Sequence, residues 1–273
     1  MEPLTLLFVP GDRPDRFDKA VAAGPDLVVL DLEDAVAPDA KDAARDHVVG
    51  WLGAGGRAAV RVNAAGTPWH DDDVQALSVL PVPVMVPKAE DPAGLAALAA
   101  RLHPGTTLLA LVETAGGVLA APSLAAVDRV SRLVLGTYDL AAQLGVSPDD
   151  RDAMAGARQA LVLASAAAGL AGPVDGVTGD VGDDDRLRDD LAYAVRLGFG
   201  GKLCVHPRQV PVARAALLSG PDELAWARRV VEAAEGSGAV LLDGAMVDKP
   251  VVDRARRILE VTVVRDRNQG RTR

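Results

Sequence analysis

Short apolar runs alternate along this chain with longer segments whose apolar residues recur at helical spacing. The runs are rich in Val and Leu, as expected for strands that are buried on both faces of a parallel sheet. In the segment 13–23, for example, Phe17, Ala20 and Val21 share one helical face. The alternation predicts successive strand–helix units. The predicted strands are 4–10, 26–32, 57–63, 83–88, 107–114, 132–137, 173–177 and 201–206.

About eight strand–helix units is the number found in a TIM (β/α)8 barrel, and 273 residues suit that fold. The main alternative, an open doubly wound sheet, usually carries a GxGxxG turn after a strand, and no predicted strand is followed by one. We therefore expect an α/β protein with a barrel domain over residues 1–220. Residues 221–273 continue beyond it and predict a C-terminal helical extension, which covers one end of the barrel as a lid or reaches a neighbouring subunit.

The composition of the chain excludes several classes of protein. The formal charge of −9 and the pI of about 4.9 argue against a nucleic-acid-binding surface. Cys204 is the only cysteine, so no internal disulfide is expected. The N-terminal segment does not resemble a signal peptide, and no apolar run approaches the length of a membrane span. These features predict a cytoplasmic protein without a membrane partner.

Two carboxylates stand at the ends of neighbouring predicted strands. Glu113 ends the run 107–114, and Asp139 follows the run 132–137. The carboxyl ends of barrel strands meet at one rim, where active sites lie. Oxygen ligands from adjacent strand ends suit Mg²⁺, so we interpret the pair as a metal site. Helix N-caps or surface salt bridges are the alternative for both residues.

Two basic residues lie in or at the end of predicted strands. Arg61 lies inside an apolar strand, and a buried guanidinium needs an anion, either a protein carboxylate or a substrate carboxylate. Lys88 ends its strand, where it could form a Schiff base with a substrate. Neutralisation of Glu33, Asp34 or Glu90 is the alternative that the nearby acids favour.

Several longer motifs resemble those of the citrate lyase β-subunit and malyl-CoA lyase family of CoA-ester lyases. They follow one another in the order found in that family and cover nearly the whole chain. The matching stretches are FVPGDRPDRFDKA (8–20), VLDLEDAVAPDAK (29–41), VRVN (60–63), GTPWHDDD (66–73), MVPKAED (85–91), LVETAGG (111–117), KLCVHPRQVP (202–211), ELAWARRV (223–230) and DGAMVDKPVVDRARRIL (243–259).

The resemblance implies a Mg²⁺-dependent TIM barrel that assembles as a homotrimer or a dimer of trimers. It implies that Glu113 and Asp139 bind Mg²⁺ and that Arg61 holds the substrate's carboxylate and carbonyl. Glu33 and Asp34 would lie beside the metal-bound waters.

For several further residues, the resemblance to this family is the only basis for a predicted role. Asp248 matches an aspartate that malyl-CoA lyases supply from the neighbouring subunit as an acid/base. The segment that meets the CoA phosphates corresponds to Arg13, Arg16 and Lys19, and we group Lys88 with these substrate contacts. Thr137-Tyr138 stands where many relatives have Ala-Glu, which leaves the substrate open.

The function that these features predict is Mg²⁺-dependent cleavage or formation of the C–C bond of a 3-hydroxyacyl-CoA such as malyl-CoA or citramalyl-CoA. The products of cleavage are an acyl-CoA and a 2-keto acid. One alternative is a citrate lyase β subunit acting on a citryl group carried by an acyl carrier protein. A class I aldolase using Lys88 is a second, and a non-catalytic CoA-binding protein is a third. The sequence is compatible with malyl-, citramalyl-, β-methylmalyl- and citryl-thioesters as substrates. It is also compatible with either direction of the reaction.

Overall fold

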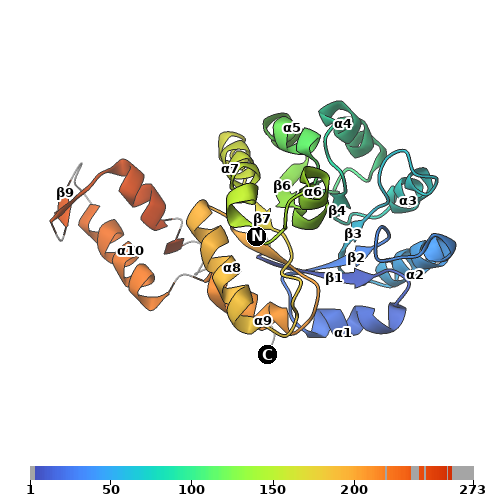
Figure 1. The fold of residues 1–273 in the computed structure, drawn as a ribbon, viewed down its shortest axis with the longest axis horizontal. Helices are drawn as coiled ribbons and strands as arrows, with labels where there is room; N and C mark the ends of the chain where they lie inside the picture. The colour runs from blue at the N-terminus through green and yellow to red at the C-terminus, as the bar shows by residue number, and fades with distance from the viewer. Residues whose placement is uncertain (1–3, 219, 235–239, 243, 257, 260–273) are drawn as a thin grey trace. The chain divides into compact units, whose positions relative to one another are not determined.

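The computed structural model describes residues 4–218, 220–234, 240–242, 244–256 and 258–259 (Figure 1). The described residues divide into two compact units, one up to residue 214 and one from residue 215 onward. The role predicted for the C-terminal residues as a lid or subunit contact stays a prediction.

Eight parallel strands close into a barrel in the first unit, and their spatial order follows the chain (Figure 1). The first strand pairs with both the second and the eighth, which completes the ring. The predicted TIM-barrel fold is therefore confirmed. The strands are β1 (Thr5–Pro10), β2 (Leu27–Asp31), β3 (Ala59–Arg61), β4 (Val84–Val86), β5 (Leu108–Val112), β6 (Val130–Leu135), β7 (Val174–Asp175) and β8 (Gly201–Cys204).

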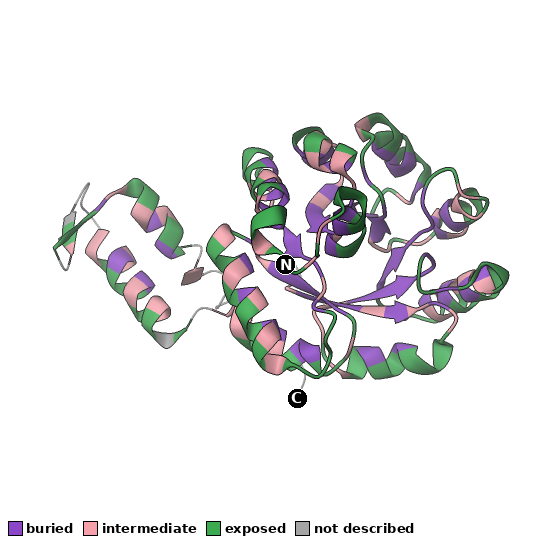
Figure 2. Cartoon of the chain, viewed as in Figure 1, coloured by how far each residue is buried: buried purple, intermediate pink, exposed green. Residues whose placement is uncertain are grey.

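Helices connect the strands and surround the barrel (Figure 1). Each longer helix buries one face and exposes the other, as the alternating colours of Figure 2 show. The helical elements are η1 (Pro14–Arg16), α1 (Phe17–Ala22), η2 (Pro38–Ala40), α2 (Lys41–Gly53), α3 (His70–Leu77), α4 (Pro92–Arg101), α5 (Ala115–Ala125), α6 (Thr137–Leu144), α7 (Arg151–Ala167), α8 (Asp184–Leu197) and α9 (Gln209–Leu217).

Apolar side chains from every strand fill a core cluster in the barrel. Strand residues alternate between this interior and the layer against the helices. The interior of the barrel is therefore packed with side chains and is not an open channel. The core cluster consists of Leu6, Val29, Ala59, Met85, Leu109, Leu111, Val134, Val174 and Leu203.

The sixth strand and the helix after it differ from the prediction. The expected strand 132–137 is shifted to β6, and Thr137 already belongs to α6. Gly136 is the N-cap of this helix, and Gly145 ends it in the left-handed conformation with a φ of 71°. Asp139 therefore lies in the first turn of a helix rather than directly after a strand.

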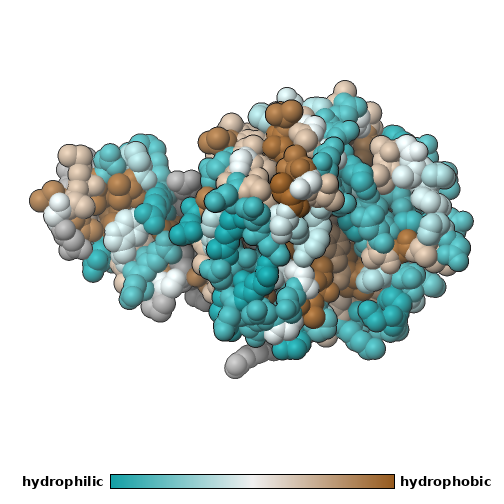
Figure 3. Space-filling model, viewed as in Figure 1, coloured by the Kyte–Doolittle hydropathy of each residue, from teal (hydrophilic) through white to brown (hydrophobic). Residues whose placement is uncertain are grey.

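The visible surface of the protein is largely hydrophilic, with smaller apolar patches (Figure 3). The large exposed apolar side chains include Leu119 on α5 and Leu163 on α7. Among the described residues, no helix combines the length and the apolar character that crossing a membrane requires.

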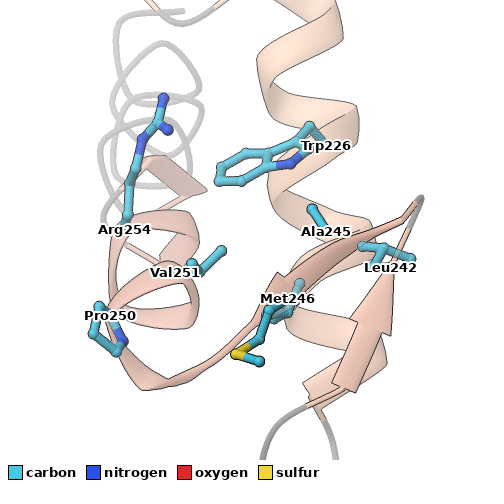
Figure 4. A pocket seen from close by; sticks show the side chains of 8 residues that line it. Trp226, Leu242, Ala245, Met246, Pro250, Val251 and Arg254 are labelled. Carbon is cyan, nitrogen blue, oxygen red and sulfur yellow. The ribbon is translucent and has the colours of Figure 1, made fainter.

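The second unit has a small core of its own. It contains α10 (Pro221–Ala234), an antiparallel pair of β9 (Val240–Leu242) and β10 (Ala245–Val247), and helical residues 249–256. A pocket of about 440 Å³ lies within this second unit (Figure 4). Trp226 and Arg254 are among the residues that line the pocket, and the Arg254 guanidinium stands 4.9 Å from the centre of the Trp226 ring. The buried core residues are Ala227, Val230, Val247, Val252 and Ala255.

Candidate active site

A buried ion pair joins the carboxyl ends of β2 and β3. Asp31 and Arg61 are register partners, so their side chains leave adjacent strands side by side. Arg61 donates from Nε to Asp31 Oδ1 at 2.7 Å and from Nη2 to Oδ2 at 2.6 Å. Both residues are buried. Arg61 thus has the anion that its burial demanded, and that anion is a protein carboxylate.

Asp31 is a site residue that the sequence patterns alone did not single out. It interrupts an apolar run in the same way as Arg61 does. A charged residue inside each of two neighbouring predicted strands was therefore the available signal. To recognise Asp31 as the partner of Arg61 required the strand register, which pairs the two positions across the sheet.

The remaining guanidinium nitrogen of Arg61 faces further acids. Its Nη1 lies 3.1 Å from Glu33 Oε2 and 3.8 Å from Asp34 Oδ2. Burial opposes the positive charge, but the hydrogen bonds and charge of Asp31, together with Glu33 and Asp34, outweigh it and raise the pKa of Arg61. Arg61 therefore keeps its positive charge at the mouth of the barrel.

Lys88 forms an ion pair with Glu33, the acid that also faces Arg61. Its Nζ lies 2.9 Å from Glu33 Oε1, so Glu33 bridges Lys88 and Arg61. Burial lowers the pKa of Lys88, but the hydrogen bond and charge of Glu33 outweigh it, and the net pKa is raised. A Schiff-base lysine needs a neutral amine, so this environment favours a lysine that neutralises Glu33.

The backbone of Lys88 is unusual for a residue with a side chain. Its φ is 49°, in the left-handed region that favours glycine. In this conformation the Lys88 N–H donates to Glu113 Oε1 at 2.9 Å. The strained residue thereby holds the carboxylate that is predicted to bind the metal.

Replacing Lys88 should separate this strain from the charge of its side chain. Both Lys88→Ala and Lys88→Gly remove the ion pair with Glu33. Because only glycine adopts a positive φ without steric cost, Lys88→Gly should be more stable than Lys88→Ala by about 1 kcal/mol. Urea unfolding in EDTA measures the difference. Equal stability of the two variants would contradict strain at this position.

Glu113 lies at the end of β5 with its side chain shielded from solvent. It is 2% exposed. Gly136, at the end of the next strand, leaves room for it, because a Cβ added to this glycine would stand 2.5 Å from Glu113 Oε2. Any larger residue at 136 would therefore displace the carboxylate. Burial, and next the charge of Glu33, raise the pKa of Glu113 to about 8. The carboxylate thus lies in a setting that lacks a full counter-charge.

Asp139 is exposed in the first turn of α6. Its charge is one of the causes of the raised Glu113 pKa, which indicates that the two carboxylates are electrostatic neighbours. Among the described residues, no group of three or more His, Cys, Asp or Glu side chains could hold a metal. Mg²⁺ commonly takes only one or two protein carboxylates and keeps waters or substrate oxygens as its other ligands. Glu113 and Asp139 fit such a site.

The other predicted residues are not all in this cluster. Arg13, Arg16 and Lys19 are exposed along the stretch that follows β1. Arg13 is held by Asp15 in a two-point contact of 3.1 and 3.2 Å. Their predicted contact with CoA phosphates stays a prediction.

Asp248 belongs to the second unit. It directly precedes the helical residues 249–256, and its main-chain carbonyl accepts from Val252 N at 3.0 Å. Its predicted acid/base role therefore also stays a prediction.

Comparison with known proteins identifies relatives along nearly the whole chain. Residues 4–207 match the HpcH/HpaI aldolase/citrate lyase family. A citrate lyase subunit beta-like protein of Mycobacterium tuberculosis is 40% identical over 261 residues, which cover 93% of each chain. A (3S)-malyl-CoA thioesterase of Cereibacter sphaeroides is 35% identical over 266 residues, again 93% of each chain. The crystal structure of M. tuberculosis CitE with magnesium, acetoacetate and coenzyme A superposes with a TM-score of 0.81 and 38% identity, covering 94% of this chain and 97% of that one.

Proposed function

Because this chain belongs to the HpcH/HpaI aldolase/citrate lyase family, we propose that it is a Mg²⁺-dependent CoA-ester lyase. Its substrate would be a 3-hydroxyacyl-CoA of the malyl-CoA or citramalyl-CoA type, cleaved to an acyl-CoA and a 2-keto acid. The observation that carries the proposal is the buried Glu113, with its raised pKa, beside Arg61 and Glu33 at one barrel rim. The related CitE structure, which contains magnesium and coenzyme A, supports the choice of cofactor and substrate class.

Glu113 and Asp139 would hold the Mg²⁺. When bound, the ion supplies Lewis-acid polarisation of the substrate's hydroxyl and carboxylate oxygens and orients them. It would also compensate the charge of Glu113, which burial and Glu33 leave unfavourable in the protein alone.

Arg61 would stabilise the negative charge that develops on substrate oxygens as the C–C bond breaks. Asp31 fixes its guanidinium through two hydrogen bonds, so Arg61 needs no reorganisation during the reaction. Glu33 and Asp34 flank Nη1 and would orient waters or the substrate hydroxyl beside it. The lysine at this rim, Lys88, would neutralise Glu33 and contact the substrate.

Asp248 would exchange the proton of the acyl-CoA enolate. In this proposal it comes from a neighbouring copy of the chain, and the protein assembles as a homotrimer or a dimer of trimers. Arg13, Arg16 and Lys19 would meet the CoA phosphates, since their side chains are exposed.

A second candidate function is hydrolysis of the same thioester. The similarity to a (3S)-malyl-CoA thioesterase favours it over a Schiff-base aldolase or a non-catalytic CoA-binding protein. Lyase and thioesterase differ in their products, because a lyase forms an acyl-CoA and a keto acid whereas a thioesterase releases free CoA and a hydroxy acid.

A panel of malyl-, citramalyl-, β-methylmalyl- and citryl-CoA tests both candidates. With Mg²⁺, we expect at least one thioester to give an acyl-CoA and a keto acid, measured by chromatography and by a keto-acid trapping reagent. EDTA should abolish this turnover. Free CoA without keto acid would identify a thioesterase instead.

The same panel separates three further activities. Turnover that persists in EDTA and is trapped by borohydride would favour a class I aldolase at Lys88. Turnover only of a carrier-linked citryl group, with copurifying partner subunits, would indicate a citrate lyase β subunit. Tight CoA binding without any cleavage would indicate a non-catalytic CoA-binding protein.

A further inference from the structure

Lys41 is a buried lysine beside the proposed site that has no role in the proposed reaction. It is the first residue of α2 and is 6% exposed. Its Nζ donates to the main-chain carbonyls of Leu32 at 2.7 Å and Glu33 at 2.6 Å. Burial lowers its pKa. Burying an ammonium is costly unless it is hydrogen-bonded. These two hydrogen bonds offset that cost and tie Lys41 to the segment that contains Leu32 and Glu33.

That segment is the first turn of chain after β2. The Leu32 N–H donates to the Arg61 carbonyl at 2.9 Å, and the Glu33 N–H donates to Asp31 Oδ1 at 2.9 Å. The amide groups of Leu32 and Glu33 are thus bound by β3 and by Asp31. Lys41 binds the carbonyl groups of the same two residues, so this short stretch is fixed on both its donor and its acceptor side.

The position of this backbone decides what the Glu33 side chain can reach. Glu33 stands 3.1 Å from Arg61 Nη1 and 2.9 Å from Lys88 Nζ, on two other strand ends. A carboxylate that bridges two cations from different strands tolerates little movement of its own main chain. Misplacement by about 1 Å of a group that supports catalysis can cost about 10²-fold in rate.

A lysine suits this place better than a neutral donor. An ammonium has three donors and no acceptor, so it can bind two carbonyls at once. Its charge also lies near Asp31, Glu33 and Asp34, and the Trp69 ring centre is 5.2 Å from its Nζ. Lys41 therefore adds a positive charge behind the acidic turn as well as two hydrogen bonds.

We propose that Lys41 is a positioning residue, which fixes the Leu32–Glu33 backbone so that the Glu33 carboxylate bridges Arg61 and Lys88. The part of this inference that concerns turnover rests on the proposed lyase function. The part that concerns the backbone can be tested without any substrate.

The experiment compares Lys41→Met and Lys41→Arg with a matched control, Arg214→Met. Arg214 donates to Asp26 Oδ1 at 2.7 Å, just before the opposite end of β2, so its loss perturbs the same strand away from the rim. Hydrogen exchange followed by mass spectrometry reads the backbone of residues 33–36. In the unmodified protein the Glu33 and Val36 amides of this segment are hydrogen-bonded. We expect about tenfold faster exchange of the segment in Lys41→Met and no change in Arg214→Met.

Kinetics of the same variants on the best thioester of the panel give a second readout. Lys41→Met should lower kcat by about 10²-fold and leave KM nearly unchanged, since the groups that bind Mg²⁺ and substrate remain. Lys41→Arg should restore most of the loss, because a guanidinium can also donate to two carbonyls. Arg214→Met should keep kcat close to that of the unmodified protein.

Unchanged exchange at 33–36 in Lys41→Met would overturn the proposal. So would a loss of kcat in Arg214→Met as large as that in Lys41→Met, because a general loss of stability would then explain both. Absence of turnover in the unmodified protein would count against the lyase function alone, and the exchange rates would still decide for or against Lys41.

Discussion

Glu113→Gln should abolish Mg²⁺-dependent turnover and at the same time stabilise the metal-free protein. Glutamine retains an oxygen that can accept the Lys88 N–H, but it has no charge with which to bind Mg²⁺. We expect kcat to fall to the background of the EDTA-treated protein. Addition of Mg²⁺ should no longer raise the melting temperature, whereas it should do so for the unmodified chain.

The stability effect follows from the raised pKa of Glu113. The folded value is about 8, against 4.5 for an unperturbed glutamate, so the folded state binds the proton more tightly. Stability of the metal-free protein is therefore lost as the pH rises from about 4.5 towards 8. The loss at pH 7 is on the order of 3 kcal/mol. Glutamine does not ionise, so the variant avoids this loss.

Melting curves in EDTA at pH 5 and pH 8 measure the effect. The advantage of Glu113→Gln over the unmodified protein should be small at pH 5 and several degrees at pH 8. Glu90→Gln is a matched control at the same rim, since Glu90 is exposed and accepts only from Thr114 Oγ1 among its described hydrogen bonds. A Glu113→Gln protein with full Mg²⁺-dependent activity would refute the metal assignment.

Arg61→Lys should be nearly as damaging, although the charge is conserved. The guanidinium reaches Asp31 through Nε and Nη2 while Nη1 faces Glu33, and an ammonium cannot reproduce this fork. We expect kcat/KM to fall by about 10³-fold, the loss typical of removing one fixed donor from a developing oxyanion. Asp31 would be left buried with only part of its hydrogen bonds, which should cost about 3 kcal/mol of stability.

Steady-state kinetics and urea unfolding check the two effects separately. Arg101→Lys serves as the control, because Arg101 pairs with the exposed Asp71 at 2.8 Å on the outer surface. A surface pair of this kind contributes at most about 1 kcal/mol, so the control should retain activity and nearly all stability. Equal behaviour of the Arg61 and Arg101 variants would remove Arg61 from the proposed mechanism.

The barrel could be predicted because its pattern is local. Runs such as 108–112 are apolar throughout because both faces of each strand are covered, and the intervening segments carry helical periodicity. The position of Glu113 at a strand end followed from the same pattern, since barrel strands all present their carboxyl ends at one rim. The end of the sixth strand was misplaced because Gly136 and Thr137 directly follow its apolar residues, and the sequence did not show that Gly136 is the N-cap of α6.

The fold and the strand-end positions of Glu113 and Arg61 could thus be predicted from the sequence, because strand ends and periodicity are properties of neighbouring residues. Which charged groups pair with one another depends on the three-dimensional fold. Asp31 meets Arg61 through the strand register, Lys41 reaches the carbonyls after β2 from a helix, and Glu33 bridges two cations. The raised pKa of Glu113 arises in the same way, from burial and from acids on other strands. Such contacts depend on how strands and helices come together in space, so no local pattern of residue types records them.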